Sequence, residues 1–346
     1  MDDQALDVQL DMFIEYFRRL LDGKSMVGLE VWATKFSQLR QNGEFELCRK
    51  LAHALRTRID AQEHETGVAR YAEGWLLDRI GKKQSAIEAY EASLKAFQQA
   101  GIPLDSIVQC QIGALYQEQG EWQKADEKYH EAIESARDDH DRALVLNNLG
   151  NLALQNNDSA AEQHFRDARE LLRDNDTRNY AAATHGLAAA LLSRNEPQQS
   201  QDMHLECYRL FQELGDASGS AAAIGGIGMA QLSAGHPRVA IHNFERVLQM
   251  DGDSALDPHI GVQTLTNLAV AHQELGEYDA ALGYLSIAIA GYADLGDWRS
   301  YIAALVNLAR LHNLCGDQAA TEQTTAKAMR AAEKYGFPED LRRLPS

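Results

Sequence analysis

Residues that could perform chemistry are present, but none stands in a recognisable catalytic or metal-binding motif. The chain has twelve histidines, yet it contains no HExxH sequence and no Cys and His residues at zinc-ligand spacing. His272 and His312 each lie four residues before a predicted helix–helix turn, where we expect them to pack. Nothing favours a Ser/His/Asp or Cys/His group assembled from distant segments. The sequence therefore predicts a protein that is not an enzyme, with no catalytic residue, metal or cofactor.

Two short motifs resemble ligand-binding loops only in part. Ile224–Gly228 (IGGIG) is glycine-rich, but it lacks the third glycine and the preceding strand of a phosphate-binding loop. The run from Asp251 to Asp257 begins like a calcium loop. Its fifth, sixth and twelfth positions are Ala255, Leu256 and Val262, where an oxygen ligand, Gly and Glu belong. We interpret the first as helix packing and the second as a linker.

The dominant pattern is a repeat of about forty residues. Residues 110–136 read as two short amphipathic helices that meet at Gly120. Gly113 and Ala125 are small enough to let the two helix backbones approach closely. The turn residue recurs, always as Gly or Asn, which tolerate the left-handed backbone of a helix exit. These markers are Gly43, Gly81, Gly120, Asn157, Asn195, Gly235, Gly276 and Gly316.

Small residues recur in register with these markers. Seven residues before the marker stand Gly74, Gly113, Gly150, Ala188, Gly228, Ala269 and Ala309. Five residues after it stand Cys48, Ala86, Ala125, Ser200, Ala240, Ala281 and Thr321. The fourth unit fits if its turn is one residue shorter, which brings Ala161 and Phe165 into register. We count eight units, of which the first and last are atypical, as the ends of stacked arrays are.

The order Gly113, Tyr116, Gly120, Trp122, Ala125, Tyr129 and Ala132 resembles the tetratricopeptide repeat. The long period is similar to that of kinesin light chains, Pins-type adaptors and bacterial Rap-type peptide receptors. The resemblance implies an all-α, right-handed superhelical solenoid of about eight helix-turn-helix units. We assign residues 1–24 to a capping or contact helix, 25–335 to the solenoid and 336–346 to a C-terminal tail that frays.

Composition agrees with a helical chain and limits its partners. There are only six prolines in 346 residues, and no alternating Val, Ile and Thr runs indicate strands. Lysine and arginine number 33 against 51 acidic residues, which gives a net charge of −18. Such a chain is repelled by nucleic acid phosphates and anionic lipid, and favours a basic partner. No apolar run is long enough to span a membrane, and no secretory signal begins the chain, so we expect a cytoplasmic protein.

The four cysteines and the N-terminal helix carry weaker signals. Cys48, Cys110, Cys207 and Cys315 are scattered without paired spacing, which predicts small buried residues rather than disulfides or zinc ligands.

Residues 3–21 form a predicted helix with two apolar stripes, one of which includes Phe17. Two stripes imply contacts on two sides. The helix is either a cap on the first unit or a contact for a homo-oligomer or a partner.

The resemblance also places a binding surface on the first helix of each unit, which lines the concave side of the solenoid. Asparagines there hold peptide backbones in the long-repeat families, because an amide both donates and accepts. Tyr71 and Trp75 would serve as apolar anchors at one end of this surface, although Trp75 is equally well explained as a core residue, and Arg310 would set register at the other end. The candidate peptide- or partner-binding residues are Tyr71, Trp75, Gln111, Asn147, Asn148, Asn151, His185, Thr266, Asn267, Asn307 and Arg310.

The asparagine series is interrupted in the fifth and sixth units by small residues. These are Ala182, Gly186, Ala189, Ala222, Gly225 and Gly226. They either admit a bulky side chain or a partner helix, or simply tighten the superhelix. We leave both readings open.

The leading functional hypothesis is a non-catalytic adaptor that binds an extended peptide or partner segment in the concave groove. The alternative is a sensor or inhibitory subunit that controls a separately encoded effector, such as a caspase-like protease, or the transcription machinery. A self-assembling scaffold built on the N-terminal helix is a third hypothesis.

Overall fold

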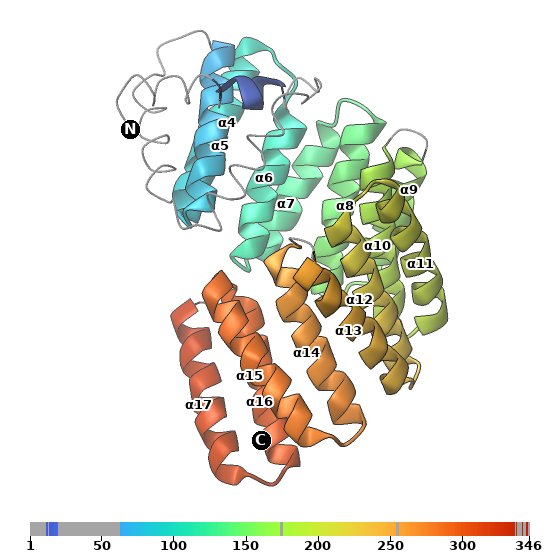
Figure 1. The fold of residues 1–346 in the computed structure, drawn as a ribbon. Coiled ribbons are helices and arrows are strands. Elements are labelled where there is room, and N and C mark those ends of the chain that lie inside the picture. Colours follow the sequence, from blue (N-terminus) through green and yellow to red (C-terminus); the bar gives the residue numbers. More distant parts are fainter. Residues whose placement is uncertain are drawn as a thin grey trace. The chain divides into compact units, whose positions relative to one another are not determined.

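The computed structural model describes residues 12, 14–19, 63–173, 176–253, 256–335, 337, 341 and 344 (Figure 1). Within these residues it contains α-helices and no β-strand, which confirms the all-α prediction. The long helices are α4 (Glu63–Arg79), α5 (Lys83–Ala100), α6 (Asp105–Glu118), α7 (Trp122–Glu134), α8 (Asp139–Gln155), α9 (Ala160–Leu172), α10 (Thr177–Ser193), α11 (Pro197–Glu213), α12 (Ala217–Ser233), α13 (Pro237–Asp253), α14 (Pro258–Glu274), α15 (Tyr278–Leu295), α16 (Trp298–Leu314) and α17 (Gln318–Tyr335).

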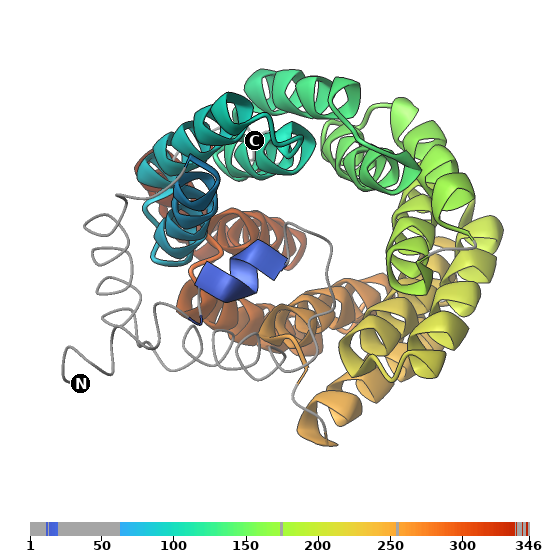
Figure 2. The same ribbon diagram turned by 90° about the horizontal axis from the view of Figure 1, so that it is seen from above.

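The chain divides into two compact units, Met1–Leu152 and Ala153–Ser346, and the division falls within α8. In the second unit the helices α10 to α17 follow one another in chain order, each packed on the next (Figures 1 and 2). This consecutive packing is that of a helical repeat, in which each pair of helices buries its apolar faces against its neighbours. The predicted first repeat, with Gly43 and Cys48, lies outside the described residues.

All seven predicted turn markers within the described ranges adopt the left-handed backbone. The φ angles are +77° at Gly81, +75° at Gly120, +55° at Asn157, +61° at Asn195, +80° at Gly235, +74° at Gly276 and +76° at Gly316. The two asparagines are the described non-glycine residues with positive φ. Asparagine tolerates this region because its short polar side chain bonds locally. The repeat count from Gly81 onward is therefore confirmed.

Close approach of the paired helices depends on the small residues. A Cβ atom added to Gly113 would lie 2.8 Å from the ring of Tyr129, and one added to Gly74 would lie 2.9 Å from that of Tyr90. Both distances are shorter than van der Waals contact. The rings therefore occupy the space that a side chain at either glycine would need. This contact offsets the roughly 0.5–1 kcal/mol cost of a glycine inside a helix.

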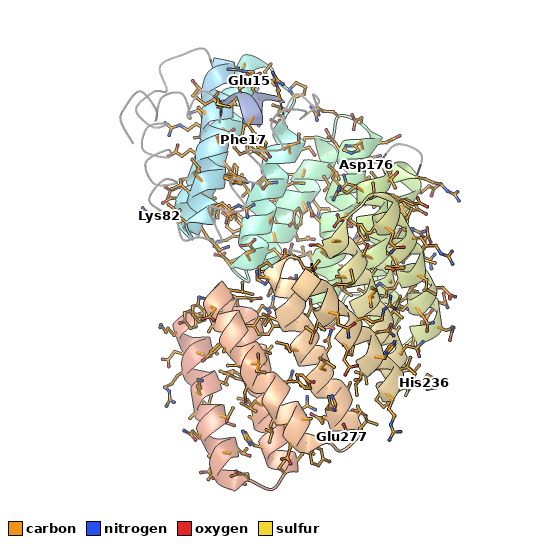
Figure 3. The ribbon with its side chains drawn as sticks, viewed as in Figure 1. Glu15, Phe17, Lys82, Asp176, His236 and Glu277 are labelled. Atoms are coloured by element: carbon orange, nitrogen blue, oxygen red, sulfur yellow. The ribbon has the colours of Figure 1, made fainter. Side chains whose placement is uncertain are left out.

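Aspartates begin several of the first helices. Carboxylates of Asp176, Asp216 and Asp297 accept hydrogen bonds from backbone N–H groups at the starts of α10, α12 and α16, at 3.0, 2.8 and 3.1 Å. Asp176 is labelled in Figure 3. Each bond satisfies an N–H group that has no partner within its own helix. Gly215 and Gly296, which directly precede two of these aspartates, have left-handed φ angles of +66° and +69°.

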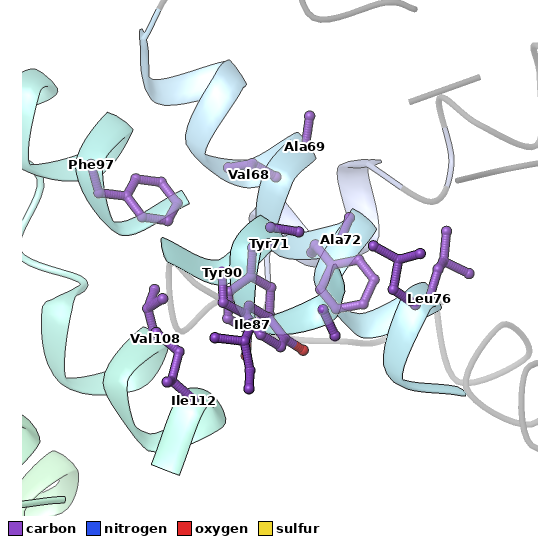
Figure 4. Close-up of a cluster of buried hydrophobic side chains, with 14 of the residues drawn as sticks. Val68, Ala69, Tyr71, Ala72, Leu76, Ile87, Tyr90, Phe97, Val108 and Ile112 are labelled. Carbon is purple, nitrogen blue, oxygen red and sulfur yellow. The ribbon is translucent and has the colours of Figure 1, made fainter. Parts of the chain in front are cut away.

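The core of the first unit includes the N-terminal segment 14–19. Phe17 (labelled in Figure 3) is 1% exposed, and its ring centroid lies 5.7 Å from that of Tyr71 and 5.6 Å from that of Trp75. Tyr71 is 4% exposed and also contacts the ring of Tyr90 (Figure 4). This burial raises the pKa of the Tyr71 phenol. A peptide could reach Tyr71 only after Phe17 had moved away, so Tyr71 belongs to the core.

Two details differ from the sequence-based expectations. Phe337, Leu341 and Leu344 pack, partly buried, against the core of the last helices, so these tail residues do not fray. Cys110 and Cys207 are buried as expected, and burial raises the pKa of both thiols to about 12. Cys315, the residue after the last residue of α16, is exposed, contrary to the prediction. It lies beyond Leu311, which is the last buried residue of that helix.

In the part of the chain that the structure describes, no helix combines the length and apolar character needed to cross a bilayer.

Candidate functional site: a pocket beside a buried histidine pair

The candidate site is a pocket of about 170 Å³ in the second unit. Three consecutive first helices, α10, α12 and α14, supply its walls, and α11 supplies one residue. The lining residues are His185, Ala189, Leu192, His204, Ala221, Ala222, Gly225, Gly226, Met229, Ile260, Gln263, Thr264 and Asn267. None of these described residues is charged. The pocket thus lies on the predicted binding side of the repeats and unites His185 and Asn267 with the small residues between them.

His204 takes a position that large aromatic rings fill in four other units. The equivalent residues are Tyr90, Tyr129, Phe165 and Phe244, all at most 1% exposed. His204 is 2% exposed. Four residues earlier, Ser200 replaces the alanine of most other units, and its buried hydroxyl also has no hydrogen-bond partner among the described residues. The fifth unit therefore carries polar groups where its neighbours carry a purely apolar core.

The imidazoles of His185 and His204 lie against each other at the bottom of the pocket. Their ring centroids are 4.9 Å apart and their planes are inclined by 64°. The Nδ1 atom of each ring is buried and has no hydrogen-bond partner among the described residues. Burial lowers the pKa of both side chains, to about 3 for His204, where His185 also contributes. Both rings are therefore neutral at physiological pH, and each has one donor and one acceptor nitrogen.

The two glycines of the pocket floor differ in their surroundings. Both lie inside α12, so the IGGIG run forms no phosphate-binding loop. A Cβ atom at Gly226 would overlap the ring of His204, whereas one at Gly225 would have no atom within 4 Å. Gly226 is thus required by the packing of His204. Gly225 faces open space and leaves room in the pocket.

This difference predicts opposite effects of the same substitution at adjacent positions. Gly225→Ala should raise the free energy of unfolding by about 0.5–1 kcal/mol, because alanine favours the helix and meets no neighbour. Gly226→Ala should lower it by about 1–3 kcal/mol, because the confined imidazole would have to move. Urea unfolding followed by circular dichroism measures both values. Equal effects of the same sign would contradict the packing described above.

The other predicted site residues of the second unit lie in different environments. Asn267 and Asn307 are half-buried, and neither side chain has a hydrogen-bond partner among the described residues, so both amides are available. Arg310 is exposed and forms no ion pair within those ranges. The Thr266 hydroxyl instead lies 3.3 Å from the Tyr292 hydroxyl and donates to the Val262 carbonyl at 3.4 Å. Thr266 therefore bonds to its own and a neighbouring helix.

In the first unit, the predicted polar residues lie on α6 and α8. Gln111, Asn147, Asn148 and Asn151 are all half-buried. The Oδ1 atom of Asn147 is buried and has no hydrogen-bond partner among the described residues. A hydrogen bond from Asn148 acts on the Cys110 thiol, although burial dominates the pKa of that thiol. Trp75 is partly covered by Phe17, and the Arg79 guanidinium lies 4.8 Å from the centre of its ring.

One cluster of possible metal ligands occurs among the described residues, at Asp138, His140 and Asp141. Its groups are already engaged in starting α8. The Asp138 carboxylate accepts from the Asp141 N–H at 2.8 Å, and Arg137 binds the Asp141 carboxylate at 2.6 and 3.1 Å. This pairing lowers the pKa of Asp141 despite its burial. The cluster is therefore explained as a helix start.

His272, which was expected to pack, stacks on Tyr284 with 5.3 Å between the ring centroids.

Sequence analysis did not single out His204, Gln263 or Thr264. A signal for His204 was present, since it stands nine residues after a turn marker, where Tyr90, Tyr129 and Phe244 stand in their units. A histidine at a position that is aromatic in four other units marks a polar group in the core. Its partner, His185, lies in the preceding helix, and no periodicity indicates that the two rings meet.

Comparisons with known proteins agree with this architecture. Residues 105–174 and 262–290 each match a family described as tetratricopeptide repeat. No curated protein matches the sequence.

Several solved structures share the fold at low sequence identity. A Rap protein complexed with Competence and Sporulation Factor has a TM-score of 0.60 at 14% identity, over 92% of this chain and 96% of that one. The apo quorum sensor NprR from B. thuringiensis has a TM-score of 0.65 at 11% identity, over 92% and 86%.

A third relative is a signal transduction ATPase (STAND protein) with a tetratricopeptide repeat sensor from Pyrococcus horikoshii. It has a TM-score of 0.55 at 14% identity over 86% of this chain, which spans only 47% of that protein. Two segments of the chain therefore match tetratricopeptide repeats, and its helical repeat fold, with left-handed turns between the paired helices, resembles the folds of the Rap protein and of NprR.

Proposed function

We propose that this protein is a non-catalytic regulatory adaptor that binds an extended peptide or a segment of a partner protein along its first helices. The observation that carries the proposal is the pocket formed by α10, α12 and α14. Its walls combine the amide of Asn267 with the imidazoles of His185 and His204. A ligand that forms hydrogen bonds with these groups gains free energy that a purely apolar wall would not provide.

The structural relatives support a regulatory rather than a purely structural role. One is a Rap protein complexed with Competence and Sporulation Factor, and another is a quorum sensor. A third carries its tetratricopeptide repeats as a sensor within a signal transduction ATPase. By analogy with this fold, ligand binding would control a separately encoded effector, which is the finer form of the proposal.

Asparagine amides would hold the backbone of the bound segment. Asn267, at the pocket on α14, and Asn307, on α16, both belong to the second unit. Each amide can donate to a peptide carbonyl and accept from a peptide N–H without reading the side chains. The pocket would then select the side chain of one residue. Because its described lining is uncharged, a basic partner would have to be recognised outside the pocket.

Selection from a library of linear heptapeptides displayed on phage tests this function on the full chain. We expect peptides enriched on the wild-type protein to lose at least tenfold in affinity to Gly225→Trp, whose side chain would fill the pocket, and to Asn267→Ala. Gly283→Trp is the matched control, because Gly283 is exposed on α15 and a Cβ there has no atom within 4 Å.

Circular dichroism must show that each variant keeps its helix content. The proposed function fails if no peptide is enriched, or if the enriched peptides bind Gly225→Trp as tightly as wild type. If the pocket variant loses binding while Asn267→Ala plus Asn307→Ala does not, the pocket is the site but the asparagines do not hold the backbone.

A further inference from the structure

We infer that the pocket beside His185 and His204 accepts one tyrosine side chain of the bound segment, with its phenol hydroxyl hydrogen-bonded to the two imidazoles. This inference rests on the proposed function, because it names the residue that the peptide would insert. Size, charge, hydrogen-bonding capacity and wall composition support it independently.

The size of the pocket suits a single aromatic ring. Its volume is about 170 Å³, and an apolar protein cavity of roughly 150 Å³ holds one benzene molecule. A second ring or a helix would not fit. Open space beside Gly225, where a Cβ would meet no atom within 4 Å, provides the entry for a side chain that comes from the first-helix face.

The charge of the pocket excludes ionised side chains. No described residue that lines it is charged, and both histidines are held neutral by burial. An ionised carboxylate, ammonium or guanidinium would lose its hydration without gaining a counter-charge, which is strongly unfavourable. The occupant is therefore an uncharged group, even though the chain as a whole carries a net charge of −18.

The hydrogen-bonding capacity of the pocket fits a hydroxyl group. Both imidazoles line the pocket, and their ring centroids lie 4.9 Å apart. A neutral imidazole carries one donor nitrogen and one acceptor nitrogen, and the tautomer decides which is which. A phenol hydroxyl donates one hydrogen bond and accepts another. It can therefore bond to both rings at once if one ring offers an acceptor nitrogen and the other a donor.

The remaining wall is apolar and suits the ring of the same side chain. Leu192, Met229 and Ile260 line the pocket together with Ala189 and Ala222. A phenylalanine would gain these contacts but would form no hydrogen bond with the two imidazoles. A serine or threonine could bond to the imidazoles but would leave most of the volume unfilled. Tyrosine meets both requirements, since it joins an apolar body to a polar tip.

Binding of two small fluorinated probes to the full chain, measured by ¹⁹F NMR, tests the inference without a peptide. 4-Fluorophenol represents the tyrosine side chain, and fluorobenzene has the same ring without the hydroxyl. We expect 4-fluorophenol to bind roughly tenfold more tightly than fluorobenzene, because only the phenol satisfies the imidazoles. 4-Fluorobenzoate, an anion, should not bind.

Three variants assign the probe to the pocket. His204→Phe should reduce the preference for phenol over fluorobenzene to about onefold, because it removes one imidazole. This ratio is internal to each variant, so a small change in pocket volume does not affect it. Gly225→Leu should abolish binding of both probes, and Gly283→Leu, on the exposed face of α15, should behave as wild type.

Each outcome decides the inference. It is overturned if fluorobenzene binds as tightly as the phenol, if neither probe binds, or if His204→Phe keeps the phenol preference. It is also overturned if Zn²⁺ binds the wild type but not His204→Phe and displaces the phenol, since the pair would then be a metal site. If the selected heptapeptides bind through the pocket but carry no tyrosine, the inference fails while the proposed function stands.

Discussion

Phe165→Ala is expected to lower the free energy of unfolding of the second unit by about 3–5 kcal/mol, the usual cost of emptying a buried aromatic site. The Phe165 side chain, on α9, is 0% exposed. Its ring occupies the space that a Cβ atom at Gly186, on α10, would need. Removal of the ring would leave a void between two helices that are each held by neighbours. Urea unfolding monitored by circular dichroism measures the loss.

A double-mutant cycle tests whether Gly186 and Phe165 are packed as described. In the wild type, Gly186→Ala should destabilise the protein by about 1–3 kcal/mol, because the new methyl group overlaps the ring. In the Phe165→Ala background the same change should be neutral or stabilising by up to about 1 kcal/mol, since the space is free and alanine favours the helix. Additive effects would show that the two residues are not in contact.

Stability should also fall as the pH is lowered, through the buried His204. Its pKa is about 3 in the folded protein and about 6.5 in an unfolded chain. The unfolded state therefore binds more protons between these values, so stability is full above pH 6.5 and decreases towards pH 3. Between pH 7 and pH 5 the loss through this one group should be about 2 kcal/mol. Burial lowers the pKa of His185 in the same direction.

The comparison of wild type with His204→Phe isolates this effect. At pH 7 the variant should be at least as stable as wild type, because it replaces an unpaired buried nitrogen by a ring like Phe165 or Phe244. It should then lose less stability on acidification. His242→Gln, at an exposed position of α13, is the control and should follow the wild-type profile. Parallel profiles for wild type and His204→Phe would contradict the burial of an uncharged imidazole.

If His204→Phe stabilises the protein, the wild-type histidine lowers stability at a site that binds a ligand. Five of the other units place Tyr, Phe or Leu at this position, namely Tyr90, Tyr129, Phe165, Phe244 and Leu285. Ligand binding would then account for the histidine. The probe-binding and unfolding experiments together separate the effect of His204 on ligand selectivity from its effect on the free energy of unfolding.

The helices, turns and caps were predictable from the sequence because they depend on residues close together in the chain. Gly81, Asn157 and Asn195 adopt the left-handed turns that their side chains permit. Asp216 and Asp297 begin helices because their carboxylates reach N–H groups three residues later. These interactions join residues only a few positions apart in the chain, so they form whatever the arrangement of the helices.

The site itself was decided by packing between helices. His185 and Asn267 were expected at a binding surface and do line the pocket, but their meeting with His204 depends on how α10, α11 and α12 rotate against one another. The same rotations leave free space beside the Cα atom of Gly225 and place the His204 ring against Gly226, although the two glycines are adjacent in the chain. Phe17 likewise covers Tyr71 from a distant segment. Sequence periodicity identifies which helix face is buried, whereas contacts between particular side chains depend on the three-dimensional fit of several helices at once.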